Sequence, residues 1–324
     1  MTVLILGGSG FVGSHIALMM AQKGEASILF DLSDPPRTIT SADSALRSMI
    51  KFERGDVADL GAIMKAAKDN QVEGIINSAR LLTGVRECFR ANAEGALNTM
   101  EVARSLDLKK IIFVSTSAVY RNTGDGSPNT EDTPRHGGAG VYGGTKYMGE
   151  LMIELYSRQY GLNGLIVRLS RIFGPGQNQV HPIGPLSGAA VVGKELKWKS
   201  GADHGLNYSY VKDCAEGIIA VYSAENPKHQ AYNIGEGRIV KNSYVIERLK
   251  ELIPEAKIEI GPGRLEFIGY NHPEGSILDS SRAKADLNYH VKYGFEKGLE
   301  EYVSHLKQNL DEAHKMANYS YKTS

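Results

Sequence analysis

The sequence contains little cysteine, no excess of charge of either sign and no long hydrophobic run. Its 324 residues include two cysteines, Cys88 and Cys214, and 37 basic residues against 37 acidic ones. Two cysteines so far apart form neither a metal cluster nor a disulfide framework, which is typical of a reducing cytosol. A chain without net charge gives no reason to expect nucleic acid or an anionic membrane as a partner.

The lack of a long apolar run argues against a transmembrane helix, which needs about 20 apolar residues. The first apolar residues, 3–6, lead straight into Gly7, with no basic segment before them and no small-residue cleavage site after them. We interpret this run as a buried strand rather than a signal peptide and expect a cytoplasmic protein. The hydrophobic content of 42% is ordinary for a globular chain, and the length suggests two domains or one large α/β unit.

Short apolar runs alternate with helical patterns through the N-terminal half of the chain. Continuous apolar runs are typical of strands buried on both faces, and their alternation with amphipathic helices predicts an α/β fold with a parallel, doubly wound sheet. We expect strands at residues 3–6, 26–30, 50–52, 74–77, 110–114 and 164–169, a returning strand at 229–234, and helices that include 59–69, 85–106 and 295–310.

Three glycines, Gly7, Gly10 and Gly13, stand between the first expected strand and the first helix, which begins near Phe11 and Val12. A tight turn needs glycine torsions, and a pyrophosphate can approach closely only where no side chain intervenes. The helix N-terminus would supply N–H donors for the phosphates. The pattern therefore predicts a dinucleotide site, although a structural turn without a ligand is the alternative.

An acid at the end of the second strand, Asp31, is placed to bind the ribose hydroxyls, which favours NAD over NADP. The nearby Arg37 leaves NADP open. After the third strand, Asp56 could bind the adenine edge or could cap the helix that starts near residue 59. We include Phe11, Val12, Val57 and Ala79 among the cofactor-binding candidates.

Tyr142 and Lys146 stand four residues apart, behind a glycine-rich run. Side chains at i and i+4 of a helix point the same way, and an ammonium lowers the pKa of a neighbouring phenol. The pair could therefore act as a general acid/base. The spacing alone favours an ordinary amphipathic helix start.

Seven segments together resemble the extended short-chain dehydrogenase/reductases, also called the NAD-dependent epimerase/dehydratase family. They are GGSGFVG (7–13), GDVAD (55–59), FVSTSAVY (113–120), TEDTP (130–134), YGGTK (142–146), RIFGPG (171–176) and YVKD (210–213). The resemblance implies bound NAD, Tyr142 as the acid/base, Lys146 beside it on the nicotinamide ribose, and Thr116 on the same substrate oxygen, with Ser117 as a second possibility for Thr116.

The resemblance also implies a Rossmann domain interleaved with a smaller C-terminal substrate domain. We expect the NAD-binding domain at residues 1–175, with 210–235 returning to it, the substrate domain at 176–209 and 236–310, and a polar, frayed tail at 311–324. Family members commonly form homodimers through two paired helices. The stripes expected to make that contact are Ala96, Met100 and Ala103 on one helix, and Met148, Met152 and Leu155 on the other.

The substrate side departs from the family pattern. Arg171 stands where nucleotide-sugar members carry an asparagine, Leu206 stands where they carry an arginine, and Arg80 lies beside the expected nicotinamide position. Both arginines could form salt bridges within the fold, but a guanidinium also suits a carboxylate. His181 and His204 are expected to be substrate-domain ligands or, more simply, exposed loop residues.

We therefore predict an NAD-dependent oxidoreductase that acts on a small hydroxy or keto substrate, which we expect to be an acid, without a metal. The first alternative is a nucleotide-sugar epimerase or dehydratase with tightly bound NAD. The second is a non-catalytic NAD-binding regulatory protein, which the intact set of Thr116, Tyr142 and Lys146 argues against.

Overall fold

A parallel sheet forms the centre of the molecule. The computed structural model describes residues 2–108, 110–120, 127–137, 140–177, 181–265 and 277–319. Within these residues, seven strands pair in the order β11-β6-β5-β4-β1-β2-β3, all of them parallel. Their bounds are β1 Thr2–Leu6, β2 Ala26–Asp31, β3 Ile50–Arg54, β4 Gly74–Asn77, β5 Lys110–Thr116, β6 Gly164–Leu169 and β11 Ala231–Ile234.

The strand order reverses at β1, which lies between β4 and β2. In open α/β sheets, ligands bind at the carboxyl ends of the strands at this switch point. The sequence places the glycine-rich turn directly after β1, so the fold puts the predicted dinucleotide site where such sheets bind ligands. The predicted Rossmann-type doubly wound sheet is confirmed.

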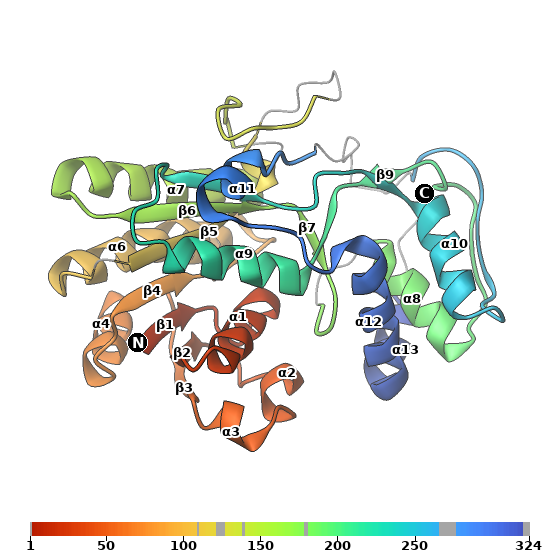
Figure 1. Ribbon diagram of the computed structural model, residues 1–324, viewed down its shortest axis with the longest axis horizontal. Coiled ribbons are helices and arrows are strands. Elements are labelled where there is room, and N and C mark those ends of the chain that lie inside the picture. Colours follow the sequence, from red (N-terminus) through yellow and green to blue (C-terminus); the bar gives the residue numbers. More distant parts are fainter. Residues whose placement is uncertain are drawn as a thin grey trace.

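Helices cover both faces of the sheet (Figure 1). On one face α1 (Phe11–Gln22) packs beside α9 (Val211–Ser223), and on the other α6 (Gly95–Ser105) packs between α4 (Leu60–Asp69) and α7 (Val141–Tyr160). The expected single helix at 85–106 is divided into α5 (Val85–Cys88), a π-helical segment η1 (Phe89–Glu94) and α6. Shorter pieces are α2 (Arg37–Thr40), α3 (Ser44–Arg47), η2 (Ser117–Val119) and α11 (Ser281–Leu287).

A smaller group of elements lies at one end of the sheet, on the right in Figure 1. It contains α8 (Ile183–Val192), α10 (Asn242–Leu252), α12 (Gly294–Gln308) and α13 (Leu310–Ala317), with the paired strands β8 (Leu196–Trp198) and β13 (Ile258–Ile260). Two further strand pairs connect it to the large sheet: β7 (Arg171–Phe173) with β10 (Tyr208–Tyr210), and β9 (Gly205–Leu206) with β12 (Val240–Lys241). The domain boundaries given above stay a prediction.

The start of the predicted frayed tail is instead a helix. Helix α13 packs along α8, where Ala313, Met316 and Ala317 are buried and Lys194 donates to the main-chain oxygen of Ala317 at 2.9 Å. The prediction of a frayed tail is wrong for these residues, because their apolar side chains recur three and four apart and cover the otherwise exposed face of α8.

The predicted dimer stripe on α6 is also wrong. Ala96, Met100 and Ala103 are fully buried against the chain's own sheet. Helix α7 differs, since Met148 and Leu155 on it remain 46% and 43% exposed. Within the described residues, no helix is long and apolar enough to cross a membrane.

Candidate functional site

The turn after β1 is built so that a side chain would block it. Gly7 has a φ of +73°, and a Cβ there would lie 2.6 Å from Ala79 Cα. A Cβ on Gly13 would lie 2.3 Å from the main-chain oxygen of Gly7. Gly10 occupies the N-cap of α1 and brings no side chain to bond the first N–H groups of the helix. These N–H groups, the free surface of the turn and the helix dipole suit a pyrophosphate.

Asp31 lies at the end of β2, beside this turn. Its two carboxylate oxygens accept hydrogen bonds from the main-chain N–H of Ser9 (3.1 Å) and of Ser33 (3.0 Å). The carboxylate is therefore held next to the glycine-rich turn. Arg37 donates to the side chain of Asn309 at 2.9 Å, and so it is engaged with the C-terminal helices rather than with Asp31.

Asp56 does not cap the helix that follows it. The cap of α4 is Asp59, whose side chain accepts from Ala62 N–H at 3.0 Å. Asp56 accepts from Ala58 N–H at 2.9 Å and from the Arg90 guanidinium at 3.3 Å. Of its two interpretations, the adenine-binding one therefore stays a prediction. The other cofactor candidates here are buried: Phe11, Val12, Val57 and Ala79.

The structure brings Thr116, Tyr142 and Lys146 together. Thr116 is the last residue of β5, and Tyr142 lies in the first turn of α7 with Lys146 one turn later. The Thr116 side chain lies close enough to the Tyr142 hydroxyl for hydrogen bonding between them to lower the pKa of the tyrosine. The neighbouring Ser117 begins η2 instead, so Thr116 is the hydroxyl that meets Tyr142.

Burial raises the pKa of Tyr142 above its usual value, against the opposing effects of the Arg80 guanidinium, the Thr116 hydrogen bond and the Arg171 guanidinium. Lys146 is not among the largest of these effects, so a lowering of this pKa by Lys146 stays a prediction. Lys146 is itself buried, and its Nζ donates to the main-chain oxygens of Ala79 and Val114 at 2.9 Å each. Burial, followed by the charge of Arg80, lowers the pKa of Lys146 to about 7.

The charges of two guanidinium groups from separate segments act on the tyrosine. Arg80 follows β4 and Ala79, whereas Arg171 is the first residue of β7. Both are partly buried, and both act electrostatically on Tyr142. The predicted site residues thus converge, and the environment of the acid/base is cationic. An anionic group on a substrate would be stabilised there.

The histidines predicted as ligands or exposed residues are both buried. His181 bonds the main-chain oxygen of Ile172 through Nε2 at 2.9 Å, and burial lowers its pKa to about 3. Its ring also packs on Tyr208 with the centroids 5.2 Å apart. His181 therefore stabilises β7 next to Arg171.

Sequence reasoning missed a buried polar network behind the site. Glu150 is fully buried, and its carboxylate accepts from Ser115 Oγ at 2.5 Å, from Arg168 Nε at 2.9 Å and from Arg135 at 2.6 Å. Arg168 also donates to the Tyr120 hydroxyl at 2.7 Å. The available signal was the spacing, because residue 150 lies one further helical turn beyond Lys146.

Two motif residues are structural. Glu131 accepts from Asn233 N–H at 2.7 Å and holds the start of the TEDTP segment against β11. Asp213 accepts from three successive main-chain N–H groups at 2.8–3.1 Å, those of Lys292, Tyr293 and Gly294, and fixes the start of α12. Their carboxylates are therefore committed to holding the fold.

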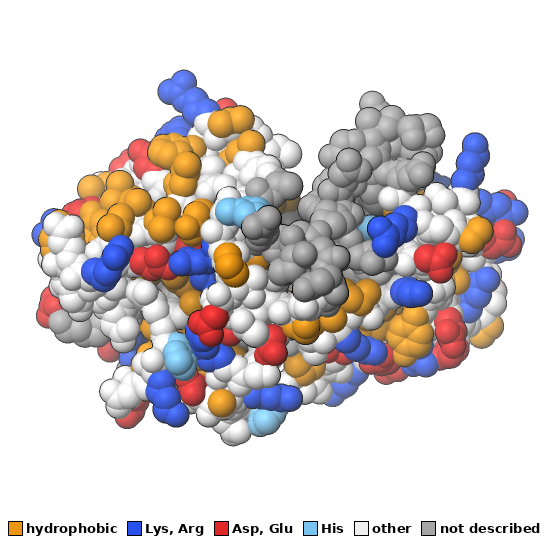
Figure 2. Space-filling model, turned by 90° about the horizontal axis from the view of Figure 1, so that it is seen from above, with side chains coloured by type: hydrophobic (Ala, Val, Ile, Leu, Met, Phe, Trp, Pro, Cys, Tyr) orange, Lys and Arg blue, Asp and Glu red, His pale blue; other side chains and the backbone are white. Residues whose placement is uncertain are grey.

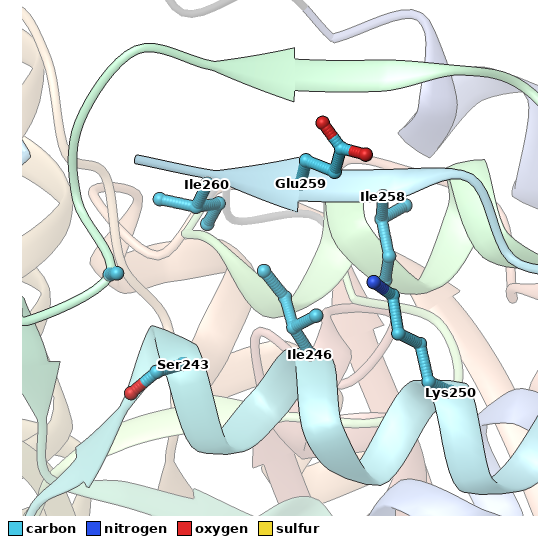
Figure 3. Close-up of a pocket in the computed structure, with 7 residues that line it drawn as sticks. Ser243, Ile246, Lys250, Ile258, Glu259 and Ile260 are labelled. Atoms are coloured by element: carbon cyan, nitrogen blue, oxygen red, sulfur yellow. The ribbon is translucent and has the colours of Figure 1, made fainter. Parts of the chain in front are cut away.

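One cavity of about 260 Å³ lies away from this site, in the smaller group of elements. It is open, and its walls come from α10 and β13, where Ile246, Ile258 and Ile260 face one another beside Lys250 (Figure 3). None of the predicted site residues lines it. Among the described residues, no group of three His, Cys, Asp or Glu side chains is arranged to hold a metal ion.

The chain is similar to known proteins over most of its length. A family model described as "NAD dependent epimerase/dehydratase family" matches residues 3–235. A UDP-glucuronate 4-epimerase of Thermodesulfobacterium geofontis is 24% identical over 95% of this chain and 97% of its own length. A putative UDP-glucose 4-epimerase of Methanocaldococcus jannaschii is 28% identical over 95% of this chain and 99% of its own.

Two solved structures share the fold. The UDP-glucose 4-epimerase of Thermotoga maritima, determined with UDP-glucose, has a TM-score of 0.84 and 23% identity and covers 96% of this chain and 100% of its own. The dTDP-glucose 4,6-dehydratase of Bacillus anthracis, in complex with NAD, has a TM-score of 0.84 and 24% identity, with 98% and 99% covered.

Proposed function

Because the chain belongs to the NAD-dependent epimerase/dehydratase family, we propose that it epimerises a carboxylate-bearing sugar linked to a nucleoside diphosphate. The observation that carries this proposal is the pair of partly buried guanidinium groups, Arg80 and Arg171, whose charges both lower the pKa of Tyr142 against the effect of burial. The predictions of an NAD-dependent enzyme and of the family are confirmed.

The residues of the chain fit NAD. The turn at Gly7 and Gly13 leaves the room that a Cβ would fill, and Asp31 is held at its edge. Lys146 has two of its three N–H groups on main-chain oxygens, which leaves one to donate to a ribose hydroxyl. When bound, NAD supplies the hydride acceptor of the oxidation and the hydride donor of the reduction.

Tyr142 takes the proton of the substrate hydroxyl as that carbon is oxidised, and returns it when the carbonyl is reduced from the other face. The Thr116 hydroxyl bonds the same substrate oxygen and holds the phenol in place. The two guanidinium groups favour the phenolate, since each lowers the pKa of Tyr142 against the effect of burial.

A carboxylate on the sugar would lie close to the reacting carbon. A guanidinium binds a carboxylate with two parallel charge-assisted hydrogen bonds, which is why we assign this group to Arg171. Relatives named UDP-glucuronate 4-epimerase support a substrate that combines a nucleotide with a sugar acid. The proposal thus joins the acidic substrate expected from the sequence with the nucleotide-sugar alternative.

A second candidate is an NAD-dependent dehydrogenase of a free hydroxy or sugar acid. It is favoured by Leu206, which stands where a phosphate-binding arginine is expected in nucleotide-sugar members. Leu206 is 4% exposed and pairs with Val240 between β9 and β12, so this position offers no cation for a diphosphate.

The test incubates the NAD-loaded protein with UDP-glucuronate, UDP-glucose, free glucuronate and a set of hydroxy acids. Proton NMR follows epimer formation, and absorbance at 340 nm follows released NADH. We expect an epimer from UDP-glucuronate without accumulation of NADH and a much slower reaction of UDP-glucose. Stoichiometric NADH from a free acid would replace the first candidate with the second, and preference for UDP-glucose would contradict the acidic substrate.

We also propose that the protein is a homodimer through η1 and α7. Phe89 on η1 is 48% exposed, and η1 packs against α7, where Met148 and Leu155 are also exposed. Seen from above, hydrophobic side chains gather over the end of the molecule that carries α7 (Figure 2). Light scattering at micromolar concentration should give a dimeric mass, and Met148→Glu should give a monomeric one. A monomeric wild type would contradict the proposal.

A further inference from the structure

A short segment, Arg135 to Gly137, contacts both of the elements that carry the acid/base pair. Arg135 forms a β-bridge with Tyr120, and the N–H groups of His136 and Gly137 donate to the main-chain oxygen of Val119 at 3.2 and 3.3 Å. These contacts lie on η2 and the residue after it, directly beyond Thr116 at the end of β5. The segment therefore fixes the turn that leaves Thr116.

The same segment lies against the first turn of α7. A Cβ on Gly143 would be 2.5 Å from the main-chain oxygen of Gly137 and 2.6 Å from that of Ala118. Helix α7 thus begins in contact with both the segment and the turn after Thr116. Since Gly143 follows Tyr142, any movement of the segment changes the position of the tyrosine relative to Thr116.

Arg135 attaches this segment along α7. Its guanidinium lies 2.6 Å from Glu150, 2.7 Å from Glu154 and 5.3 Å from the ring centre of Tyr147. These three partners occupy one face of α7 over two turns. Glu150 in turn accepts from Ser115 Oγ at 2.5 Å, the residue before Thr116.

We propose that Arg135 is a positioning residue: by fastening residues 135–137 to α7, it maintains the approach of Tyr142 on α7 to Thr116 at the end of β5. The inference rests on the proposed function only in that Tyr142 is the acid/base. Without Arg135, the segment keeps two long main-chain bonds to Val119, whereas Glu150 keeps Arg168 and Ser115 as partners. The fold should therefore survive the substitution.

The pH dependence of turnover separates positioning from a purely structural role. Tyr142 is faced by Thr116 from β5, by Arg80 from the loop after β4, by Arg171 from β7 and by Cys88 from α5. Of these groups, Thr116 is the one that directly precedes the turn held by the segment, so its interaction with Tyr142 is the one most sensitive to the segment. Its loss should move the rising limb of the rate profile to higher pH, because a bond that favours the phenolate is removed.

The experiment compares Arg135→Gln with Arg282→Gln. Arg282, on α11, bonds Asp132 at 2.9 Å and so attaches the preceding part of the chain to α11 instead of α7. We expect Arg135→Gln to lower kcat about tenfold, to shift the rising limb to higher pH and to leave NAD affinity unchanged. Arg135→Lys should restore part of kcat. The control should keep the wild-type profile.

Equal pH profiles for Arg135→Gln and wild type, with only a lower melting temperature, would overturn the proposal. Hydrogen exchange supplies a measurement that needs no substrate. In Arg135→Gln, peptides covering 115–120 and 140–148 should exchange faster, and in Arg282→Gln they should not. Unchanged exchange contradicts the positioning role even if no substrate is turned over, whereas faster exchange together with an inactive wild type contradicts only the proposed function.

Discussion

The cofactor half and the substrate half of the site are built from different kinds of chemical group. The cofactor half consists of glycines, main-chain N–H groups and one fixed carboxylate, that of Asp31. The substrate half consists of long cationic side chains: Arg80 follows β4, Arg171 begins β7, and the charges of both act on Tyr142. The first half recognises a ligand by leaving room for it, and the second recognises a ligand by charge.

This difference determines what each half can tolerate. A glycine whose Cβ would lie 2.3 Å from a main-chain oxygen cannot be replaced without moving the backbone, so the cofactor half is fixed by sterics. A guanidinium can be replaced by other side chains without moving the backbone. The substrate half can therefore change its ligand through single substitutions, while the cofactor half remains the same.

The largest effect is expected at Tyr142, where the halves meet. Tyr142→Phe removes the group that exchanges a proton with the substrate, and general acid/base catalysis contributes about 10²–10⁴-fold to rate. We expect kcat to fall by about 10³-fold with NAD affinity nearly unchanged, because Lys146 and the glycine-rich turn are intact. Steady-state kinetics and calorimetric NAD titration measure the two effects. A parallel loss of NAD affinity would show that the halves are not separable.

The second-largest effect is expected on stability, at the contact between α1 and the loop that follows β7. His15 on α1 is buried and bonds the main-chain oxygen of Pro175 through Nε2 at 2.9 Å, and burial lowers its pKa from 6.5 to about 4. Between these values the unfolded chain binds a proton that the folded chain does not. The free energy of unfolding should therefore fall as pH decreases from about 6.5 to 4, by up to about 3 kcal/mol from His15.

His15→Gln keeps a donor for Pro175 but does not titrate. Urea unfolding between pH 7.5 and 4.5 should show a shallower loss of stability in this variant than in wild type. His181, whose pKa is lowered to about 3, also makes the free energy of unfolding fall as pH decreases. It does so equally in both proteins, so its contribution cancels when their slopes are compared. Equal slopes would show that His15 is not held neutral in the folded chain.

Arg171→Lys tests the substrate half alone. Lysine keeps the charge but cannot make two parallel bonds to a carboxylate, and a hydrogen bond to a charged group contributes about 1.5–3 kcal/mol. We expect KM for the acidic substrate to rise about tenfold or more, with kcat reduced less and NAD affinity unchanged. UDP-glucose serves as the control substrate, since its KM should not follow this change. An unchanged KM for the acid would contradict the assignment of Arg171.

The cofactor half was predictable from the sequence, and the substrate half only in part. The Gly7 turn is a local pattern whose requirement lies in the backbone, so the pattern identifies it wherever the strand and helix flank it. Tyr142 and Lys146 lie on one helix, so their spacing predicted a shared helix face, whereas their roles were implied only by the resemblance of several segments to the family. That the charges of both arginines act on Tyr142 depends on where the fold places the ends of β4 and β7, which no local pattern encodes.

The failures have similar causes. Ala96, Met100 and Ala103 have the spacing of a contact stripe, but the spacing cannot say whether the contact is a second subunit or the chain's own sheet. The segment after residue 310 is rich in polar residues, yet its few apolar ones lie on one face and cover α8. The contact between Arg135 and Glu150 was missed because the two residues are 15 positions apart and a loop brings them together, so no helix or strand periodicity indicates it.

The smallest effect is expected at Asp31, and it tests whether the cofactor half discriminates by charge as well as by room. The carboxylate would repel a ribose 2′-phosphate, so NAD should bind far better than NADP to the wild type. Asp31→Ala removes the repulsion but also removes the acceptor of the Ser9 and Ser33 N–H groups, so affinity for NAD should fall somewhat. We expect the NAD to NADP affinity ratio to narrow by about tenfold, or ~1.4 kcal/mol.

Arg37→Ala is the matched control, because Arg37 bonds Asn309 and should not affect the ratio. Tighter binding of NADP than NAD by the wild type, or a ratio that changes in Arg37→Ala and not in Asp31→Ala, would show that the arginine and not the acid sets the cofactor preference.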